Sequence, residues 1–106
     1  MQFDKDLSSP NRELFQAARE YLLSCEGMIE TKKPRITTYS SDKGGICHMR
    51  TMPHRIDFGF LKGARMKDEP GRLTGSGKAM RVLSLSALDK DLVDYYLCQA
   101  FALNSR

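Results

Sequence analysis

The segment GRLTGSGKAMRVLSLS, residues 71–86, combines glycine and lysine in the manner of loops that hold phosphate. Glycine lets backbone amides approach an anion closely, and lysine supplies positive charge. A P-loop requires G-x-x-x-x-G-K-[ST], but Arg72 stands in place of its first glycine and Ala79 in place of its hydroxyl residue. The segment also leads into an apolar strand, so no helix dipole would face the phosphate. The sequence therefore excludes a P-loop.

The same segment fails the dinucleotide-binding pattern G-x-G-x-x-G, because Met80 occupies the place of the third glycine. No nucleotide is therefore expected, and no other cofactor is indicated. A simpler anion site remains, in which Gly75 and Gly77 would offer amides while Lys78 and Arg81 would bring charge. Arginine can hold a carboxylate or a phosphate through two hydrogen bonds. The alternative is a turn whose glycines serve only the shape of the backbone.

The chain of 106 residues has a net charge of +4 at pH 7, and this charge is unevenly distributed. From Lys32 to Arg81 there are 12 basic and 4 acidic residues, whereas the two ends are acidic on balance. The positive electrostatic potential of the basic middle segment favours an anionic partner, either a small ligand or a nucleic acid. The alternative is a solvated basic surface without a partner.

Histidine and cysteine residues form no recognisable metal or catalytic pattern. Neighbours in a strand point to opposite faces, so Cys47 and His48 cannot share one ion without a bulge, and His54 does not complete a site. We expect Cys47 in the core and His48 on the outer face of a sheet. Cys25 and Cys98 fall on apolar helix stripes, which predicts reduced, buried thiols. No acid–base pair or activated nucleophile appears, so an enzyme is the least supported class.

Two amphipathic helices are predicted near the ends of the chain, where they would support these residues. The first begins at Ser9-Pro10, a favourable cap and first-turn pair, and ends near Gly27. The second has Ser86 or Asp89 as its cap and acidic residues in its first turns. Its expected buried stripe consists of Leu92, Tyr96, Leu97, Ala100 and Phe101.

Four strands are predicted between the helices, where β-branched and aromatic residues become frequent. Their sequences are ITTYS, ICHMRTM, IDFGFL and MRVLSLS. In the third, Ile56, Phe58 and Phe60 alternate with Asp57 and Gly59, so one face is apolar and Gly59 leaves room on the other. By the same alternation, Leu83 and Leu85 of the last strand point inward and Ser84 points outward. Arg81, at the start of this strand, is expected on the same side as Leu83.

Strands grouped between helices predict an α+β fold. We expect a two-layer sandwich, an antiparallel sheet of about four to five strands with both helices on one face, as a single domain over residues 1–106. No apolar run reaches the roughly 18 residues that a membrane span needs, and the start MQFDKDLSSP lacks a signal peptide's apolar core. A cytoplasmic location without a membrane partner is expected. The uncovered sheet face would be available for pairing with a second copy as a homodimer.

The segment IDFGFLKGARMKDEPGRLTGSGKAMRVLSL resembles the signature of the YdhG-like domain, a bacterial family of undefined function. The resemblance covers nearly the whole chain, since the family also has flanking helices and an early strand that ends in tyrosine, here Tyr39. It implies a frataxin-like fold. The matching positions are Phe60, Gly63, Pro70, Gly71, Leu73, Gly75, Gly77, Lys78, Arg81, Leu83 and Leu85.

The resemblance also implies an alternative function, because some members of the family have been proposed to be iron chaperones. A hard cation needs several converging oxygen ligands, but the acidic residues here are spread over different helix faces. A second alternative is nucleic-acid binding through the basic sheet region, with Tyr39, Phe58 and Phe60 as stacking rings.

The leading prediction is a non-enzymatic binding module for a small anionic or polar ligand. Its site would lie where the long loop before the last strand meets the sheet. The candidate ligand-binding residues are Lys33, Tyr39, Gly75, Gly77, Lys78 and Arg81.

Overall fold

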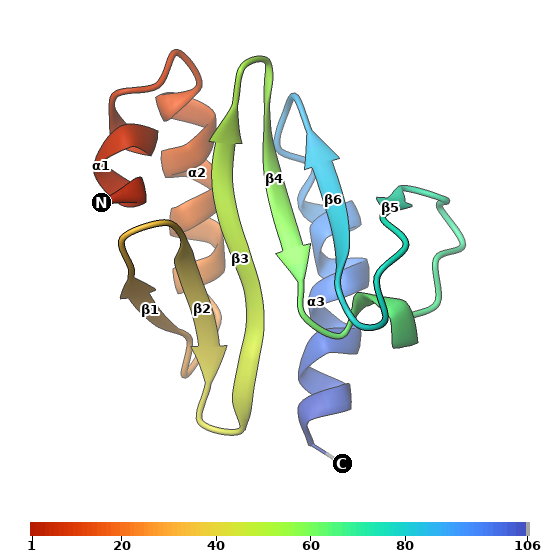
Figure 1. The fold of residues 1–106 in the computed structure, drawn as a ribbon. Helices are drawn as coiled ribbons and strands as arrows, with labels where there is room; N and C mark the ends of the chain where they lie inside the picture. The colour runs from red at the N-terminus through yellow and green to blue at the C-terminus, as the bar shows by residue number, and fades with distance from the viewer. Residues whose placement is uncertain (106) are drawn as a thin grey trace.

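Residues 1–105 are described by the structure, a computed structural model, in which one six-stranded antiparallel sheet is combined with α-helices (Figure 1). The strands lie in the order β1-β2-β3-β4-β6-β5, so the chain builds four neighbouring strands before β6 joins β4. The elements are α1 (Gln2–Leu7), α2 (Arg12–Leu23), β1 (Ile29–Lys32), β2 (Thr37–Ser41), β3 (Gly44–Met52), β4 (Arg55–Phe60), the 3₁₀ turn η1 (Gly63–Arg65), β5 (Leu73–Thr74), β6 (Arg81–Leu85) and α3 (Lys90–Asn104).

The predicted α+β fold is confirmed. In Figure 1 the sheet lies in front and α2 and α3 lie behind it. The sheet has six strands, slightly more than expected, because β1 and β5 were not predicted. The sequence of β1 is the polar IETK and β5 has only two residues, so neither shows apolar alternation. Each pairs with a strand that was predicted: β1 with β2, and β5 with β6.

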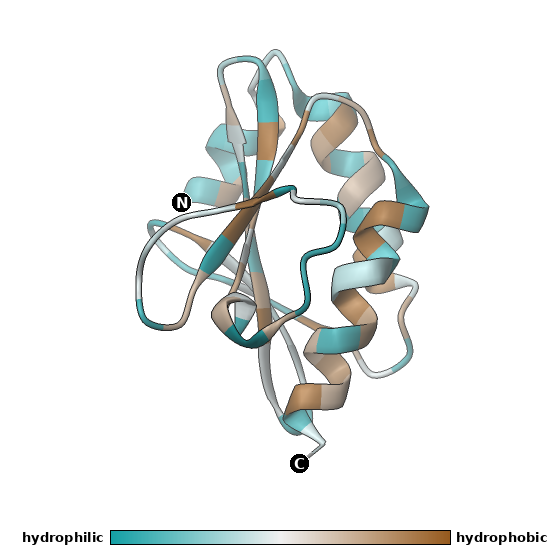
Figure 2. Cartoon of the chain, turned by 90° about the vertical axis from the view of Figure 1, so that its right-hand side faces the viewer, coloured by the Kyte–Doolittle hydropathy of each residue, from teal (hydrophilic) through white to brown (hydrophobic). Residues whose placement is uncertain are grey.

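The register of the strands divides the sheet into a helix-covered face and an open face. In the pair of β4 and β6, Phe58 lies opposite Leu83 and Ile56 opposite Leu85, and all four side chains are buried on the helix-covered face. Burial of this apolar surface between the two layers is the main stabilising term. Figure 2 shows hydrophobic and hydrophilic segments alternating along strands and helices. The helices contribute buried Phe15, Ala18, Leu22, Val93, Tyr96, Leu97 and Ala100.

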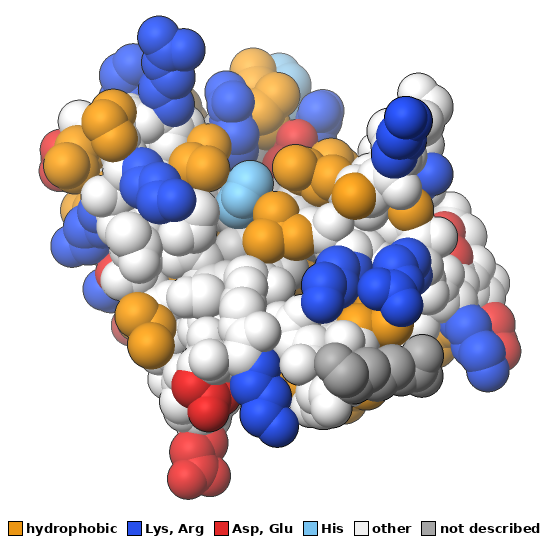
Figure 3. Space-filling model, turned by 60° about the horizontal axis from the view of Figure 1, so that its bottom comes forward, with side chains coloured by type: hydrophobic (Ala, Val, Ile, Leu, Met, Phe, Trp, Pro, Cys, Tyr) orange, Lys and Arg blue, Asp and Glu red, His pale blue; other side chains and the backbone are white. Residues whose placement is uncertain are grey.

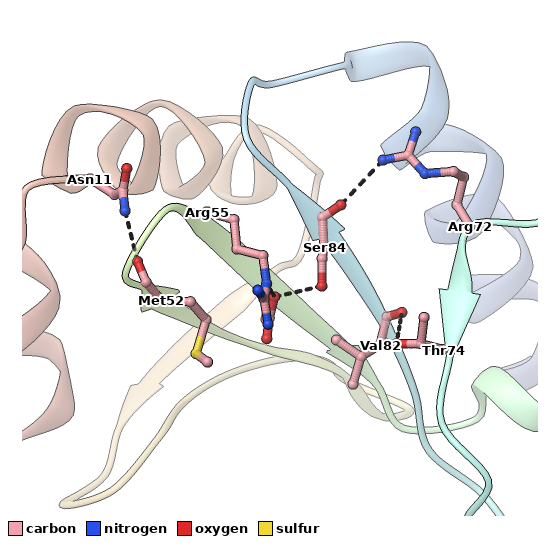
Figure 4. A network of polar contacts seen from close by, with 8 residues as sticks. Asn11, Met52, Arg55, Arg72, Thr74, Val82 and Ser84 are labelled. Carbon is pink, nitrogen blue, oxygen red and sulfur yellow. Dashed lines mark hydrogen bonds and ion pairs between the residues drawn. The ribbon is translucent and has the colours of Figure 1, made fainter.

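The N-terminal region contains two helices where one was predicted. Helix α2 begins after Asn11 and ends at Leu23, inside the predicted limits. The side-chain amide of Asn11 donates to the carbonyl oxygen of Met52 at 2.7 Å, which ties the link between α1 and α2 to the turn after β3 (Figure 4). Helix α1 is anchored by buried Asp6, whose Oδ1 accepts from the backbone N and Oγ1 of Thr51 at 3.0 and 2.7 Å. Contacts with β3 therefore hold this short helix.

Helix α3 has the predicted cap, since Oδ1 of Asp89 accepts from the backbone N of Leu92 at 3.1 Å. The prediction of the buried stripe is correct for Tyr96, Leu97 and Ala100, but Leu92 and Phe101 are only half-buried. Cys98 is exposed, so its prediction as a core residue is wrong. The reason is geometric: each residue of an α-helix is turned by about 100° from the last, so Cys98 lies about 200° from buried Tyr96 and faces away from the core.

The other two cysteines lie closer to the core. Cys47 is buried, as predicted, and burial raises the pKa of its thiol. Cys25 is half-buried beyond the end of α2, and burial raises the pKa of its thiol as well. Within residues 1–105, no helix combines the length and the hydropathy that crossing a membrane requires.

Candidate functional site

The structure separates the predicted ligand-binding residues: Tyr39 is buried in the sheet, whereas the others lie in the connections between strands or at the start of β6. Tyr39 has no exposed surface and lies on the helix-covered face, where its hydroxyl donates to Oε2 of Glu30 at 2.9 Å. Arg19 of α2 donates to both carboxylate oxygens of Glu30, at 2.7 and 2.9 Å. Tyr39 is thus part of a closed polar cluster of three side chains that joins α2 to β1 and β2. From this position it cannot form the wall of an open site.

The protonation states in the cluster of Arg19, Glu30 and Tyr39 are strongly biased. Burial by itself would raise the pKa of Glu30, but the hydrogen bonds from Arg19 and Tyr39 outweigh it and hold the pKa below its usual value. Burial and the neighbouring carboxylate raise the pKa of Tyr39. The cluster therefore contains a carboxylate, a guanidinium and a neutral phenol at neutral pH.

Arg81 stabilises the turn of residues 75–80 between β5 and β6, called the glycine–lysine turn below. Its Nη1 donates to the carbonyl oxygen of Met80 at 2.8 Å and also to that of Gly77, so the guanidinium closes the turn that precedes β6. The backbone of Gly63 packs tightly beneath it: a Cβ added there would lie 2.5 Å from Cβ of Arg81. These contacts assign Arg81 a role in shaping the turn.

The remaining predicted residues lie at the surface. Gly75 has φ of +118°, a conformation that strongly favours glycine, whereas Gly77 has open space around it. Lys78 and Lys33 are exposed, and neither belongs to an ion pair formed within the described part of the chain. Gly75, Gly77, Lys78 and Arg81 share one turn, while Lys33 lies in the connection between β1 and β2.

A hollow of about 210 Å³ lies on the open face of the sheet, over β3, β4 and β6. His48, Gly59 and Val82 are opposite one another in the register of these three strands. Met80 reaches this hollow from the glycine–lysine turn, and its Sδ lies only 3.0 Å from the position of a Cβ added to Gly59. Figure 3 shows hydrophobic side chains gathered around a histidine, with Lys and Arg side chains nearby. The lining residues are Ile36, His48, Met49, Arg50, Asp57, Gly59, Met80 and Val82.

The charges around the hollow are positive on balance. Asp57 is already neutralised: its Oδ1 accepts from Nε of Arg55 at 3.0 Å and from Oγ of Ser84 at 2.7 Å. Arg72 adds a bond of 3.3 Å to the carbonyl oxygen of Ser84 (Figure 4). Arg50 is exposed and takes part in none of the ion pairs of residues 1–105. A free guanidinium therefore stands at the edge of an apolar hollow.

His48 contributes a neutral imidazole to the hollow. Burial lowers its pKa, and the positive charge of Lys33 lowers the pKa further. The imidazole can donate one hydrogen bond and accept another. As predicted, His48 lies on the outer face, opposite in direction to buried Cys47. The sequence signal for this site was the alternation of β4, which leaves space at Gly59, but the sequence did not indicate that Met80 and Arg50 would meet there.

Among the residues that the structure describes, no three His, Cys, Asp or Glu side chains are grouped so that they could hold a metal ion. A second hollow of about 380 Å³ lies between α2 and the start of α3. Two of its polar side chains are engaged, since Oγ of Ser24 donates to the carbonyl oxygen of Tyr21 at 2.6 Å and the Tyr21 hydroxyl donates to Asp94. That hydrogen bond, together with burial, raises the pKa of Tyr21 to about 12. The second hollow is lined by a carboxylate, Glu20, as well as by a cation, Lys90, whose Nζ lies 5.4 Å from the centroid of the Tyr21 ring. The open-face hollow is the better candidate for an anion because its own carboxylate, Asp57, is paired with Arg55, which leaves Arg50 in excess.

The fold and the hollow define a class of small α+β domain whose sheet is covered on one face and carries a basic, partly apolar depression on the other. No protein-family model matches the chain, and no curated protein or solved structure with significant similarity to it was found. The resemblance to the YdhG-like domain stays a prediction.

Proposed function

We propose that the protein is a binding module that takes a small anionic ligand in the hollow on the open face of its sheet. The observation that carries the proposal is Arg50, an exposed arginine without a carboxylate partner among residues 1–105, at the edge of the hollow of about 210 Å³. Arginine binds carboxylate and phosphate through paired, charge-assisted hydrogen bonds. Binding sites of this kind combine an apolar lining with a few polar groups that orient the ligand.

The glycine–lysine turn supports this site from its rim. Met80 is in the hollow, and Lys78 precedes it by two residues, which places their Cα atoms within about 7 Å of each other. Arg81 fixes the shape of the turn through its bonds to backbone carbonyls. In this proposal Lys78 adds long-range attraction for an anion, whereas Arg81 acts as a positioning residue.

The burial of the aromatic side chains argues against the nucleic-acid alternative. Tyr39, Phe58 and Phe60 have no exposed surface, so none of the three can stack on a base. The iron alternative would need a cluster of oxygen ligands, whereas the open face presents arginine and lysine. A small anion fits the charge of this face better than either alternative.

Titration calorimetry with acetate, benzoate and inorganic phosphate tests the proposal. Arg50→Gln is expected to weaken binding by about tenfold or more, because it removes a charged hydrogen-bond donor. Lys43→Gln is the matched control, since Lys43 is exposed in the turn between β2 and β3 and also lacks an ion pair within residues 1–105. Equal losses in the two variants, or no binding of any of the three anions to the wild type, would contradict the proposal.

A further inference from the structure

We infer that the ligand carries a single planar ring, which enters the gap over Gly59 and displaces Met80 while its carboxylate binds Arg50. This inference rests on the proposed function and names the class of ligand: a one-ring aromatic carboxylate. It follows from the shape of the gap, its volume, its present occupant and the presence of unpaired Arg50 in its lining.

The gap is created by the register of the open face. One row of residues runs across the sheet, and within it Gly59 stands between His48 and Val82. The two flanking Cα atoms are two strand spacings apart, about 9 to 10 Å. Because glycine has no side chain, the centre of this row is a depression with an imidazole on one side and an aliphatic wall on the other. An imidazole packs favourably against an aromatic ring in an offset or edge-on arrangement.

The volume of the hollow, with Met80 in its present position, suits a ligand of one ring. An apolar cavity of about 150 Å³ is large enough to hold benzene. The hollow of about 210 Å³ therefore has space for one ring and a small substituent. Pockets for drug-sized ligands begin at about 300 Å³, so a nucleotide or a fused ring system would extend well beyond this hollow.

Met80 presently fills the part of the gap that the ring would take. Its Sδ lies 3.0 Å from the Cβ position of Gly59, and 39% of its surface is exposed. It is the far end of a flexible side chain, so it can move without disturbing the strands. A thioether sulfur also contacts the edges of aromatic rings favourably, so the displaced side chain would remain in contact with the ligand.

The anionic end of the ligand has a defined partner. Arg50 follows His48 by two residues on the same face of β3, so its Cα is about 6.5 to 7 Å further along the strand. Asp57, opposite Arg50 in the register, accepts from Arg55 and Ser84 through Oδ1 and forms no ion pair with Arg50 within residues 1–105. A carboxylate attached to a ring over Gly59 therefore points toward the free cation.

Titration of the full chain with four probes tests the ring and the charge separately. Benzoate is planar and anionic, cyclohexanecarboxylate is anionic but not planar, acetate has no ring, and benzamide has the ring without the charge. Benzoate is expected to bind about threefold or more tighter than cyclohexanecarboxylate. It is also expected to bind tighter than acetate and benzamide. Equal affinity for benzoate and either of the other anions overturns the inference and leaves the proposed function standing. If none of the three carboxylates binds, the inference is overturned, and if inorganic phosphate does not bind either, the anion site itself is disproved. Equal affinity for benzamide and benzoate disproves the anion site as well.

Two variants test the position of the ring. Gly59→Ala places a methyl group in the gap and is expected to weaken benzoate binding by about tenfold while acetate binding is unchanged. Met80→Ala removes an exposed side chain, so the fold should persist, and benzoate affinity is expected to stay equal or to rise. A fall of tenfold or more in Met80→Ala overturns the inference, as does a folded Gly59→Ala variant that binds benzoate normally. If Gly59→Ala does not fold, Met80→Ala and the four probes still decide the outcome.

Discussion

The two faces of the sheet are formed by alternate residues of the same strands, yet their polar groups are organised differently. On the helix-covered face, Arg19, Glu30 and Tyr39 satisfy one another within a closed cluster. On the open face, Asp57 is paired, whereas Arg50 is in no ion pair within residues 1–105. The first arrangement stabilises the fold, and the second leaves binding capacity unused.

This difference shows why burial alone does not identify a site. Tyr39 is a deeply buried ionisable group with a raised pKa, which is often a mark of function. Its hydroxyl has a protein partner, however, and it lines neither of the two hollows described above. Arg50 is unremarkable in burial but combines free charge with an adjacent depression. Unused hydrogen-bonding capacity beside a hollow is the more informative combination.

The largest expected effect is the difference in unfolding free energy between a substitution on the helix-covered face and one on the open face. Phe58→Ala should lower the free energy of unfolding by about 3 to 5 kcal/mol, because Phe58 is fully buried between the strands and the helices. Val82→Ala, on the open face of the neighbouring strand, should cost about 1 kcal/mol or less. Urea denaturation of both variants measures the difference. Comparable losses would show that the open face is also packed.

A second comparison concerns two glycines before β6: Gly63, which is closely packed, and Gly77, which has open space around it. Gly63→Ala should destabilise the protein by about 1 to 3 kcal/mol, because the new Cβ would lie 2.8 Å from the backbone N of Arg81. Gly77→Ala should be neutral or stabilise by up to about 1 kcal/mol, since nothing lies within 4 Å and φ is not positive. Thermal unfolding distinguishes the two, and a large loss in Gly77→Ala would assign that glycine a structural role.

Breaking the closed cluster should have an effect that depends on pH. Glu30→Gln is expected to cost about 1 to 3 kcal/mol at neutral pH, because it leaves Arg19 without its carboxylate partner. The folded-state pKa of Glu30 lies below the ordinary value of 4.5, so the unfolded chain takes up this proton first as the pH falls. The stability difference between wild type and variant should therefore be complete above pH 4.5 and shrink below it.

Urea denaturation over a series of pH values measures this difference, with Glu26→Gln as the control. Glu26 is exposed and belongs to none of the ion pairs of the described chain, so its substitution should have little effect at any pH. A loss in Glu30→Gln that persists unchanged in acid would show that the carboxylate charge is not the stabilising feature.

The smallest expected effect concerns the protonation of His48 on the open face. The charged groups around it are Lys33 in the connection before β2, Arg50 on β3, and Asp57 on β4 with its partner Arg55. An anion in the hollow favours the charged imidazole and so raises the lowered pKa of His48. Binding then takes up a proton, and affinity should increase as the pH falls.

Calorimetric titration of benzoate from about pH 7.5 down to about pH 5.5 measures this dependence. A rise of a few-fold, up to about tenfold for each unit by which the pKa is raised, is expected. His48→Gln should bind benzoate with an affinity that hardly changes over this range. The same pH dependence in His48→Gln would place the titrating group elsewhere.

Local patterns in the sequence predicted the elements that carry clear alternation. The inward positions of Phe58 and Leu83 and the opposite directions of Cys47 and His48 follow from the period of two in a strand. The cap of α3 at Asp89 is equally local, because a side-chain oxygen satisfies an amide three residues away. These features require no knowledge of which elements are neighbours.

Elements with weak local patterns were missed. Helix α1 has six residues, too few to be stable alone, and it depends on the hydrogen bonds between Asp6 and Thr51. β1 depends likewise on its pairing with β2, because its own sequence is polar. In both cases the stabilising partner is remote in sequence or lies on another element.

The sequence by itself determined the α+β class, the faces of the central strands and the basic character of the middle of the chain. Only the tertiary structure decided that Tyr39 belongs to a closed cluster, while Met80 and Arg50 line one hollow on the open face. The physical reason is that alternation states which residues share a face, but not which face the helices cover or which charges find partners. Those outcomes depend on the order of the strands in the sheet and on contacts between residues far apart in the chain.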